Sequence, residues 1–270
     1  MKTVNQLYIN GQWVDARGTD VHPVINPATE QEIAHVQSAS EADVNDAVAA
    51  AKAAFGSFSQ TTLEERGKLL EKLLAIYERR RNEFAATLTE EMGSPISFSE
   101  TVQTALGVGH IQATINALKD MKLEEVRGPS LIVREAAGVA GLITPWNFPI
   151  NQIFTKVASA LGAGCTMVLK PSEIAPLDAI LFAEMMDEAG VPAGVFNLVF
   201  GDGPGVGSML SRHPDIEVIS FTGSTRAARE ISKDASDTIK MVHLELGGKS
   251  PNVILDDADF ATAVPLGLNV

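Results

Sequence analysis

Five segments of this 270-residue chain place polar or glycine residues directly after a short apolar stretch. Together they offer an asparagine amide, a lysine ammonium, glutamate carboxylates and several glycines that leave backbone N–H groups uncovered. Such groups can bind phosphate, stabilise an oxyanion and move a proton. The segments are Thr-Pro-Trp-Asn-Phe-Pro (144–149), Lys-Pro-Ser-Glu (170–173), Gly-Asp-Gly-Pro-Gly-Val-Gly (201–207), Phe-Thr-Gly-Ser-Thr (221–225) and Glu-Leu-Gly-Gly-Lys (245–249).

Taken one at a time, these segments have ordinary structural explanations as well as functional ones. The glycine-rich segment departs from the G-x-G-x-x-G dinucleotide pattern, because Val206 occupies the last glycine position. The turn at 222–224 can bind a phosphate or simply begin a helix, and Lys170 can be a surface lysine with a buried stem. Glu245 is expected to emerge from a strand buried on both faces, where it is either ion-paired for structure or held as a general base.

Short apolar stretches without two-residue alternation must position these segments. They alternate with helical segments long enough for right-handed crossovers, which is typical of a parallel sheet buried on both faces. The carboxyl ends of parallel strands meet at one edge of a sheet, so the five segments are expected to form one site there. The sequence therefore predicts an α/β fold with a doubly wound, mostly parallel sheet. The expected strands are 139–143, 166–169, 195–199, 218–221 and 242–244.

The first 122 residues are expected to add a hairpin and helices to this sheet. Asn10-Gly11 is a strong two-residue turn signal between two short apolar strands. Ser40 and Thr62 each precede an acidic residue by three positions, which is the spacing of a capping box that begins a helix. Gly93-Ser94-Pro95 then marks the end of the next helix.

Residues 123–136 have a different pattern, in which charged and apolar residues mix on both sides of Gly128-Pro129. This pattern predicts two strands that form a protruding β-arm. A β-arm with exposed apolar residues often pairs with another subunit, but an ordinary surface hairpin would look the same.

The net charge of −13 disfavours nucleic acid and anionic membrane as partners, because both require a positive protein surface. No apolar stretch approaches the ~20 residues of a membrane-spanning helix, and the N-terminus lacks the apolar core of a secretory signal. Cys165 is the one cysteine, so no internal disulfide is expected and a reducing compartment is compatible. We expect a cytoplasmic protein, and no metal site is predicted.

The Pro-Trp-Asn-Phe-Pro, Lys-Pro-Ser-Glu, Phe-Thr-Gly-Ser and Glu-Leu-Gly-Gly-Lys motifs, in this order and spacing, closely resemble the aldehyde dehydrogenase superfamily. The resemblance covers essentially the whole chain and includes the Asn-Pro-Ala-Thr turn at 26–29. It implies the N-terminal, cofactor-binding part of an enzyme that oxidises an aldehyde to a carboxylic acid with NAD(P), on a Rossmann-like sheet. The implied parts are 1–122 and 137–245 for the NAD-binding domain, 123–136 for an oligomerisation arm and 246–270 for the start of a catalytic domain.

The resemblance also implies roles for individual residues. Asn147 is implied to donate to an oxyanion, and Glu245 to act as the general base that activates water. Trp146 is implied to line the channel for cofactor and substrate. Lys170 and Glu173 are implied to bind the adenosine ribose hydroxyls, where the Glu173 carboxylate should repel a 2′-phosphate. NAD is therefore the expected cofactor, with NADP as the alternative.

Further cofactor contacts are implied along the same motifs. Ala228 stands where the family commonly has glycine, at a helix start close to the sheet, and one extra methyl is expected to be tolerated. The further contacts are Gly203, Pro204 and Gly207 beside the adenine, Gly223 and Ser224 around the pyrophosphate, Thr222, Leu246 and Gly247 towards the nicotinamide, and also Ile143, Thr144, Pro145, Ser172 and Phe221.

The nucleophilic cysteine of the family follows the glutamate by roughly thirty residues, which would place it beyond Val270. Cys165 is expected to be a small semi-buried residue at the opposite edge of the sheet and cannot replace it. The chain alone is therefore expected to be inactive. The whole protein is predicted to oxidise a small-molecule aldehyde, through a thiohemiacetal and a thioester on that cysteine, as a homodimer or homotetramer.

Two other interpretations are open. A non-catalytic NAD-binding module would bind the cofactor without turnover, but the chain ends inside an apolar, helix-like run at 265–270. A structural protein that uses the fold for assembly alone would have no need of intact cofactor motifs.

Overall fold

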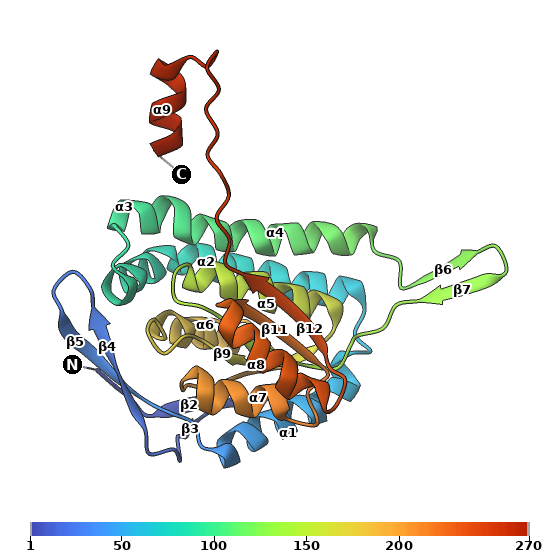
Figure 1. The fold of residues 1–270 in the computed structure, drawn as a ribbon. Helices are drawn as coiled ribbons and strands as arrows, with labels where there is room; N and C mark the ends of the chain where they lie inside the picture. The colour runs from blue at the N-terminus through green and yellow to red at the C-terminus, as the bar shows by residue number, and fades with distance from the viewer. Residues whose placement is uncertain (1, 269–270) are drawn as a thin grey trace.

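A seven-stranded sheet lies at the centre of the computed structural model, which describes residues 2–268 (Figure 1). Its strands are β2 (Gln6–Ile9), β3 (Gln12–Asp15), β8 (Val139–Ile143), β9 (Thr166–Lys170), β10 (Phe196–Leu198), β11 (Val218–Gly223) and β12 (Met241–Leu246). The strand order is β12-β11-β8-β9-β10-β2-β3, and the strands from β12 to β10 run parallel. The predicted α/β fold with a mostly parallel, doubly wound sheet is confirmed.

Two layers of helices cover the faces of this sheet. The helices are α1 (Glu41–Phe58), α2 (Leu63–Met92), α3 (Ile96–Phe98), α4 (Thr104–Asp120), α5 (Pro149–Ala163), α6 (Leu177–Glu188), α7 (Ser208–Arg212), α8 (Thr225–Ser236) and α9 (Phe260–Leu268), with π-helical turns η1 (Ser99–Gln103) and η2 (Gly203–Gly207). In one layer α7 contacts both α1 and α8, and in the other α2, α4, α5 and α6 pack together. Both α1 and α5 contact β8 and β9, and every residue of these two strands is buried. Burial on both faces explains why these strands are uniformly apolar.

The strand β12 is more exposed than the sequence predicted. It forms the edge of the sheet, pairs only with β11, and is contacted by α8. Met241, His243 and Glu245 are exposed, whereas the residues between them are partly buried. The expectation that Glu245 emerges from a strand buried on both faces is therefore wrong, because nothing among the described residues covers the other face of this strand.

Local signals set the ends of the long helices as expected. Ser40 Oγ accepts from the Asp43 N–H at 3.2 Å and Asp43 Oδ2 accepts from the Ser40 N–H at 2.8 Å, which completes the capping box of α1. The helix α2 begins after a similar capping box at Thr62 and ends at Gly93, which has a left-handed φ of +79°. One helix of 30 residues occupies this stretch, where a second helix was expected before Gly93.

The N-terminal strands build two smaller features. The strands β2 and β3 form the predicted hairpin, with Asn10 and Gly11 at φ +52° and +76°, and β2 pairs antiparallel with β10. A separate sheet with the order β1-β5-β4 consists of β1 (Lys2–Val4), β4 (Val21–Asn26) and β5 (Gln31–Gln37).

Two segments project from the body of the protein (Figure 1). The strands β6 (Glu124–Arg127) and β7 (Ser130–Val133) form the predicted arm as an antiparallel hairpin, with Gly128 at a left-handed φ of +59°. The chain after β12 extends away from the sheet and ends in α9, none of whose described residues is buried. Within residues 2–268, no helix combines the length and the apolar character that a bilayer crossing requires.

The buried side chain of Asn197 attaches the N-terminal hairpin to the parallel sheet. Its Oδ1 accepts from the Asn10 N–H at 2.9 Å, and its Nδ2 donates to the carbonyls of Met167 and Gly194 at 3.1 and 2.8 Å. Replacing Asn197 with alanine should lower the free energy of unfolding by about 3 kcal/mol, because three backbone groups, two of them in buried hydrogen bonds, lose their partner. Urea denaturation measures this, and Asn82→Ala, at an exposed position of α2, is the control. Equal stability of the two variants would contradict the prediction.

Candidate functional site

The carboxyl ends of the parallel strands lie along one edge of the sheet, as the sequence predicted. The register pairs Ile143 with Lys170 on one side and with Phe221 on the other, and it pairs Thr222 with Glu245. The motif residues at and after these positions are therefore neighbours in space. Cys165 directly precedes β9, so it lies at the opposite edge of the sheet, as expected. It is buried there.

The ammonium group of Lys170 is enclosed at this edge, and only 2% of the residue is exposed. Its Nζ donates to the carbonyl oxygens of Gly201 at 2.6 Å and Pro171 at 2.9 Å, and lies 3.4 Å from Glu173 Oε2. Burial lowers the pKa of Lys170, and the Glu173 carboxylate opposes that shift. A surface lysine is therefore excluded, and this ammonium joins the turns that follow β9 and β10. Ser172 is buried in the same turn, whereas Glu173 is partly exposed.

The glycine-rich segment has a packing reason for its departure from the dinucleotide pattern. Val206 is buried against Gly201, where an added Cβ would lie 2.3 Å from a valine methyl. Asp202 Oδ1 accepts from the Gly205 N–H at 2.7 Å and caps the turn η2. Gly203 and Pro204 are exposed on the outside of this turn, while Gly207 is buried and faces the aliphatic stem of Lys170.

The Phe-Thr-Gly-Ser motif passes directly from β11 into α8. Ser224 is the N-cap of this helix, and its Oγ accepts from the Ala227 N–H at 3.2 Å. The first turn of α8 therefore presents backbone N–H groups at the strand edge, where an anion is favoured. Ala228 is buried where α8 approaches the sheet, so its methyl is accommodated. Thr222 Oγ1 is buried and has no hydrogen-bond partner among the described residues.

A cavity of about 730 Å³ lies beside β12 and is lined by Lys156, Ser220, Thr222, His243 and Glu245 among others. The Glu245 side chain is 65% exposed, and its Oε1 lies 3.4 Å from His243 Nε2. Lys156 on α5 is buried and donates to Ser220 Oγ at 2.9 Å. Burial lowers the pKa of Lys156 to about 8, and the charge of Glu245 opposes that shift.

The sequence analysis did not identify Lys156 or Ser220. A signal was present, because Lys156 follows Ile153 and Phe154 and precedes Val157 on a buried face of α5. A lysine within the apolar stripe of a helix is seldom buried without a polar partner. That partner is on β11, so only the fold reveals it.

Asn147 and Trp146 are exposed in the turn between β8 and α5. Trp146 retains 49% exposure, and Phe148, which follows, packs edge to face against Phe98. Asn147 is at the same edge of the sheet as Glu245 but does not line the cavity that contains Glu245. The structure thus places both predicted catalytic residues on one edge without bringing their side chains together.

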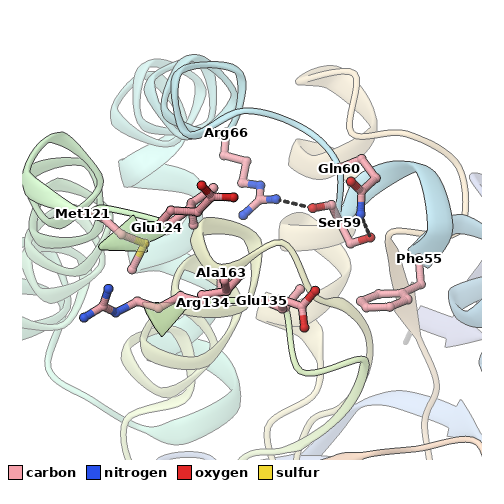
Figure 2. A pocket seen from close by; sticks show the side chains of 12 residues that line it. Phe55, Ser59, Gln60, Arg66, Met121, Glu124, Arg134, Glu135 and Ala163 are labelled. Carbon is pink, nitrogen blue, oxygen red and sulfur yellow. Dashed lines mark hydrogen bonds between the residues drawn. The ribbon is translucent and has the colours of Figure 1, made fainter. Parts of the chain in front are cut away.

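A second cavity of about 490 Å³ lies at the base of the β-arm, away from the strand ends (Figure 2). Arg66 is buried there, and its guanidinium donates to Ser59 O at 2.7 Å, Thr61 Oγ1 at 2.9 Å and Gly162 O at 3.3 Å. The guanidinium packs against Gly164, where an added Cβ would lie 2.4 Å from its central carbon. Arg66 therefore closes the carboxyl end of α5, and none of the predicted site residues lines this cavity.

Comparison with known proteins identifies the family. The model of the aldehyde dehydrogenase family matches residues 13–269, so the chain belongs to that family. The chain is 51% identical, over 269 residues, to 3-succinoylsemialdehyde-pyridine dehydrogenase from a Pseudomonas species, covering 99% of this chain and 56% of that protein.

Two solved structures have the same fold. An aldehyde dehydrogenase from Bartonella henselae superposes with a TM-score of 0.97 at 50% identity, covering 100% of this chain and 57% of that one. A cysteine-to-alanine mutant of aldehyde dehydrogenase C from Pseudomonas syringae, in complex with NAD+ and octanal, superposes with a TM-score of 0.96 at 47% identity, covering 98% and 55%. The chain thus spans about half the length of these relatives.

Replacing Lys156 with methionine should stabilise the chain at neutral pH by about 1–3 kcal/mol, because an ammonium no longer has to be buried. Since its pKa is about 8 in the folded chain, below the ordinary value of 10.5, the folded chain loses this proton first. The cost of the buried charge is thus present below pH 8, and stability recovers as the pH rises from 8 towards 10.5.

Urea denaturation at neutral pH and in an alkaline buffer measures this recovery. It should be present in the unchanged chain and in Lys72→Met, at an exposed position of α2, and reduced in Lys156→Met. An equal response in all three proteins would contradict the assignment.

Proposed function

We propose that this chain is the cofactor-binding part of an NAD-dependent aldehyde dehydrogenase. The observation that carries the proposal is the single sheet edge at which the motif segments of parallel strands meet, because ligands of such sheets bind there. Membership of the aldehyde dehydrogenase family and the close superposition on a structure that contains NAD+ and octanal support it.

The adenosine end of the cofactor is proposed to lie over the turns after β9 and β10. Lys170 is held rigidly by two carbonyl oxygens, so it fixes the turn that presents Ser172 and Glu173. A Glu173 carboxylate next to the ribose can accept hydrogen bonds from two hydroxyls but repels a 2′-phosphate. NAD is therefore proposed over NADP. Gly203, Pro204 and Gly207 are proposed to lie against the adenine.

The pyrophosphate and nicotinamide ends are proposed to follow the same edge towards β12. Gly223 and Ser224 lead into the N-terminus of α8, whose backbone N–H groups suit a pyrophosphate. The bound NAD would supply the hydride acceptor of the reaction. The further residues proposed to contact it are Ile143, Thr144, Pro145, Trp146, Phe221, Thr222, Leu246 and Gly247.

In the whole protein the reaction is proposed to use a cysteine nucleophile beyond Val270. Asn147 would donate a hydrogen bond to the oxyanion formed when that thiolate attacks the aldehyde carbonyl. Glu245 would take a proton from the water that hydrolyses the resulting thioester to the carboxylic acid. The chain by itself is accordingly proposed to bind cofactor without turnover.

The remaining parts of the chain are proposed to serve assembly of the whole enzyme. Residues 1–122 and 137–245 form the NAD-binding domain, and 246–270 begins the catalytic domain. The arm at 123–136 would pair with another subunit of a homodimer or homotetramer, since its apolar side chains are exposed. The exposed large apolar side chains of the arm are those of Leu123, Val126, Leu131 and Val133.

Replacing Glu173 with glutamine should raise the affinity for NADP relative to NAD by about fivefold to tenfold, because one like-charge repulsion is removed. Calorimetric titration of the chain with each cofactor measures the ratio. Glu78→Gln, at an exposed position of α2, should keep the original preference for NAD. Absence of NAD binding by the unchanged chain would overturn the proposed function, and an unchanged ratio in Glu173→Gln would remove Glu173 from its role.

Replacing Glu245 with glutamine in the whole enzyme should leave an initial burst of NADH and slow steady-state turnover by about 10²–10⁴-fold, as expected for loss of a general base. Stopped-flow absorbance separates the burst from the steady state. Glu230→Gln, at an exposed position of α8, should change neither. Unimpaired turnover in Glu245→Gln would show that another group activates the water.

A further inference from the structure

Two carboxyl groups are buried together where the last turn of α2 meets the first turn of α6. Glu91 is 1% exposed and Asp178 is 0% exposed. Among the described residues, no lysine, arginine or histidine forms an ion pair with either group. Two adjacent carboxylates without a counter-charge cannot both be ionised in a dry environment.

The hydrogen bonds at this junction are unequal. Glu91 Oε2 accepts from the Leu177 N–H at 2.6 Å, and Oε1 accepts from the Asp178 N–H at 3.0 Å, so this carboxylate caps α6. Both carboxyl oxygens of Asp178 are buried and receive no hydrogen bond from another described donor. A proton held between the two carboxyl groups would leave a single negative charge on the pair, beside the helix N-terminus that favours it.

The surroundings favour a proton over a metal ion as the balancing charge. Within residues 2–268, no group of three or more histidine, cysteine, aspartate and glutamate side chains could hold a metal. Tyr77 on α2 is near enough for the charge of Asp178 to raise its pKa, and Arg81, which acts on Tyr77 in the opposite sense, is bound to Glu100 O and Thr104 Oγ1. No cationic side chain contributes to the pKa of either carboxyl group.

The junction lies at one end of the segment that contains the turn proposed to bind the adenosine ribose. Residues 171–176 connect Lys170, at the end of β9, to Leu177, at the start of α6. Lys170 holds one end of this segment through the carbonyls of Pro171 and Gly201, and Glu91 holds the other end through two N–H groups. The position of the ribose-binding turn therefore depends on both attachments.

We propose that Glu91 and Asp178 are positioning residues that share one proton and thereby hold residues 171–176 in the cofactor-binding conformation. Loss of the proton places two negative charges side by side, loosens the start of α6 and weakens cofactor binding. The part of this inference that concerns the cofactor rests on the function proposed above, whereas the proton-dependent attachment of the segment does not.

The expected pH dependence follows from the direction of the shifts. Burial raises the pKa of Asp178 to about 7, and burial together with the adjacent Asp178 raises that of Glu91 well above its ordinary value. The folded chain therefore keeps a proton that the unfolded chain releases near the ordinary carboxyl pKa of about 4. The charge of Asp178 raises the pKa of Glu91, so the pair loses one proton near pH 7 and the shared proton at a higher pH. The stabilisation that the shared proton provides is lost as the pH rises through the pKa of Glu91.

The test compares the pH response of the unchanged chain with that of Asp178→Asn. An asparagine amide stays neutral and can donate an N–H to Glu91 at every pH, so it reproduces the protonated pair. Hydrogen exchange of residues 171–178, after correction for intrinsic rates, and the Kd for NAD are measured from pH 6 to pH 9. In the unchanged chain, protection should fall and Kd should rise by about tenfold as the shared proton is lost above pH 7, and in Asp178→Asn both should stay nearly constant.

The matched control is Glu90→Gln, which neutralises an exposed carboxylate of α2, one residue before Glu91. It should keep the full pH response. If Asp178→Asn does not fold, infrared difference spectra of the unchanged chain provide a second measurement, because a protonated buried carboxyl has a distinct carbonyl band. That band should weaken near pH 7 and disappear as the shared proton is lost at higher pH.

Several results would overturn the proposal. These are a pH response that persists in Asp178→Asn, protection of 171–178 that does not depend on pH in the unchanged chain, or absence of the carboxyl band. Saturable stabilisation of the unchanged chain by K⁺ or Mg²⁺, absent from Asp178→Asn, would show that a cation balances the charge and would overturn it too. If protection follows the prediction but no NAD binds at any pH, the attachment is confirmed and the function proposed for the turn fails.

Discussion

The parallel register of β8, β9 and β11 is the constraint on which the rest of the structure depends. The strands β8 and β9 lie between two helical layers, so their backbone groups must be paired within the sheet and their side chains must be largely apolar. The motif residues consequently lie at or after the strand ends, although Gly141 and Ser220 lie within strands. Since the strands run in the same direction, the ends that carry the motifs collect at one edge. The pairing that buries the core also brings Lys170, the turn before α8 and Glu245 to one surface.

Buried charges hold the turns at the ends of these elements. The Lys170 ammonium binds carbonyl oxygens after β9 and β10, the Arg66 guanidinium binds carbonyl oxygens beside the end of α5, and the Glu91 carboxylate binds N–H groups at the start of α6. In each case the partners are backbone groups with partial charges, as at helix termini. Such contacts cost desolvation, but they specify the conformation of a turn more strictly than apolar packing can. Lys170 and Glu91 hold the two ends of the segment that is proposed to bind the ribose, whereas Arg66 closes a helix end away from the proposed site.

Sequence patterns predicted the features whose cause is local or periodic. The strand at 139–143 was predicted at both ends because burial on both faces makes its whole length apolar, and the capping box at Ser40 depends on neighbouring residues alone. The patterns failed where the cause is a contact between distant segments. Lys156 on α5 meets Ser220 on β11, and Val206 packs on Gly201 rather than leaving room for a glycine turn. Periodicity contains no information about such pairs.

Because β12 is an exposed edge strand, the sheet fixes the position of Glu245 but not the reactivity of its carboxylate. The register with β11 fixes where the Glu245 backbone lies, yet its side chain is largely exposed and its Oε1 lies 3.4 Å from His243 Nε2. General-base catalysis is most effective where water is excluded and burial adjusts the proton affinity of the base. The cavity beside β12 supplies the charge of Lys156 but leaves one side open. In the proposed enzyme, the surface that packs over β12 must therefore set both the access of water to Glu245 and the proton affinity of its carboxylate. This sheet sets only the direction in which the Glu245 side chain points.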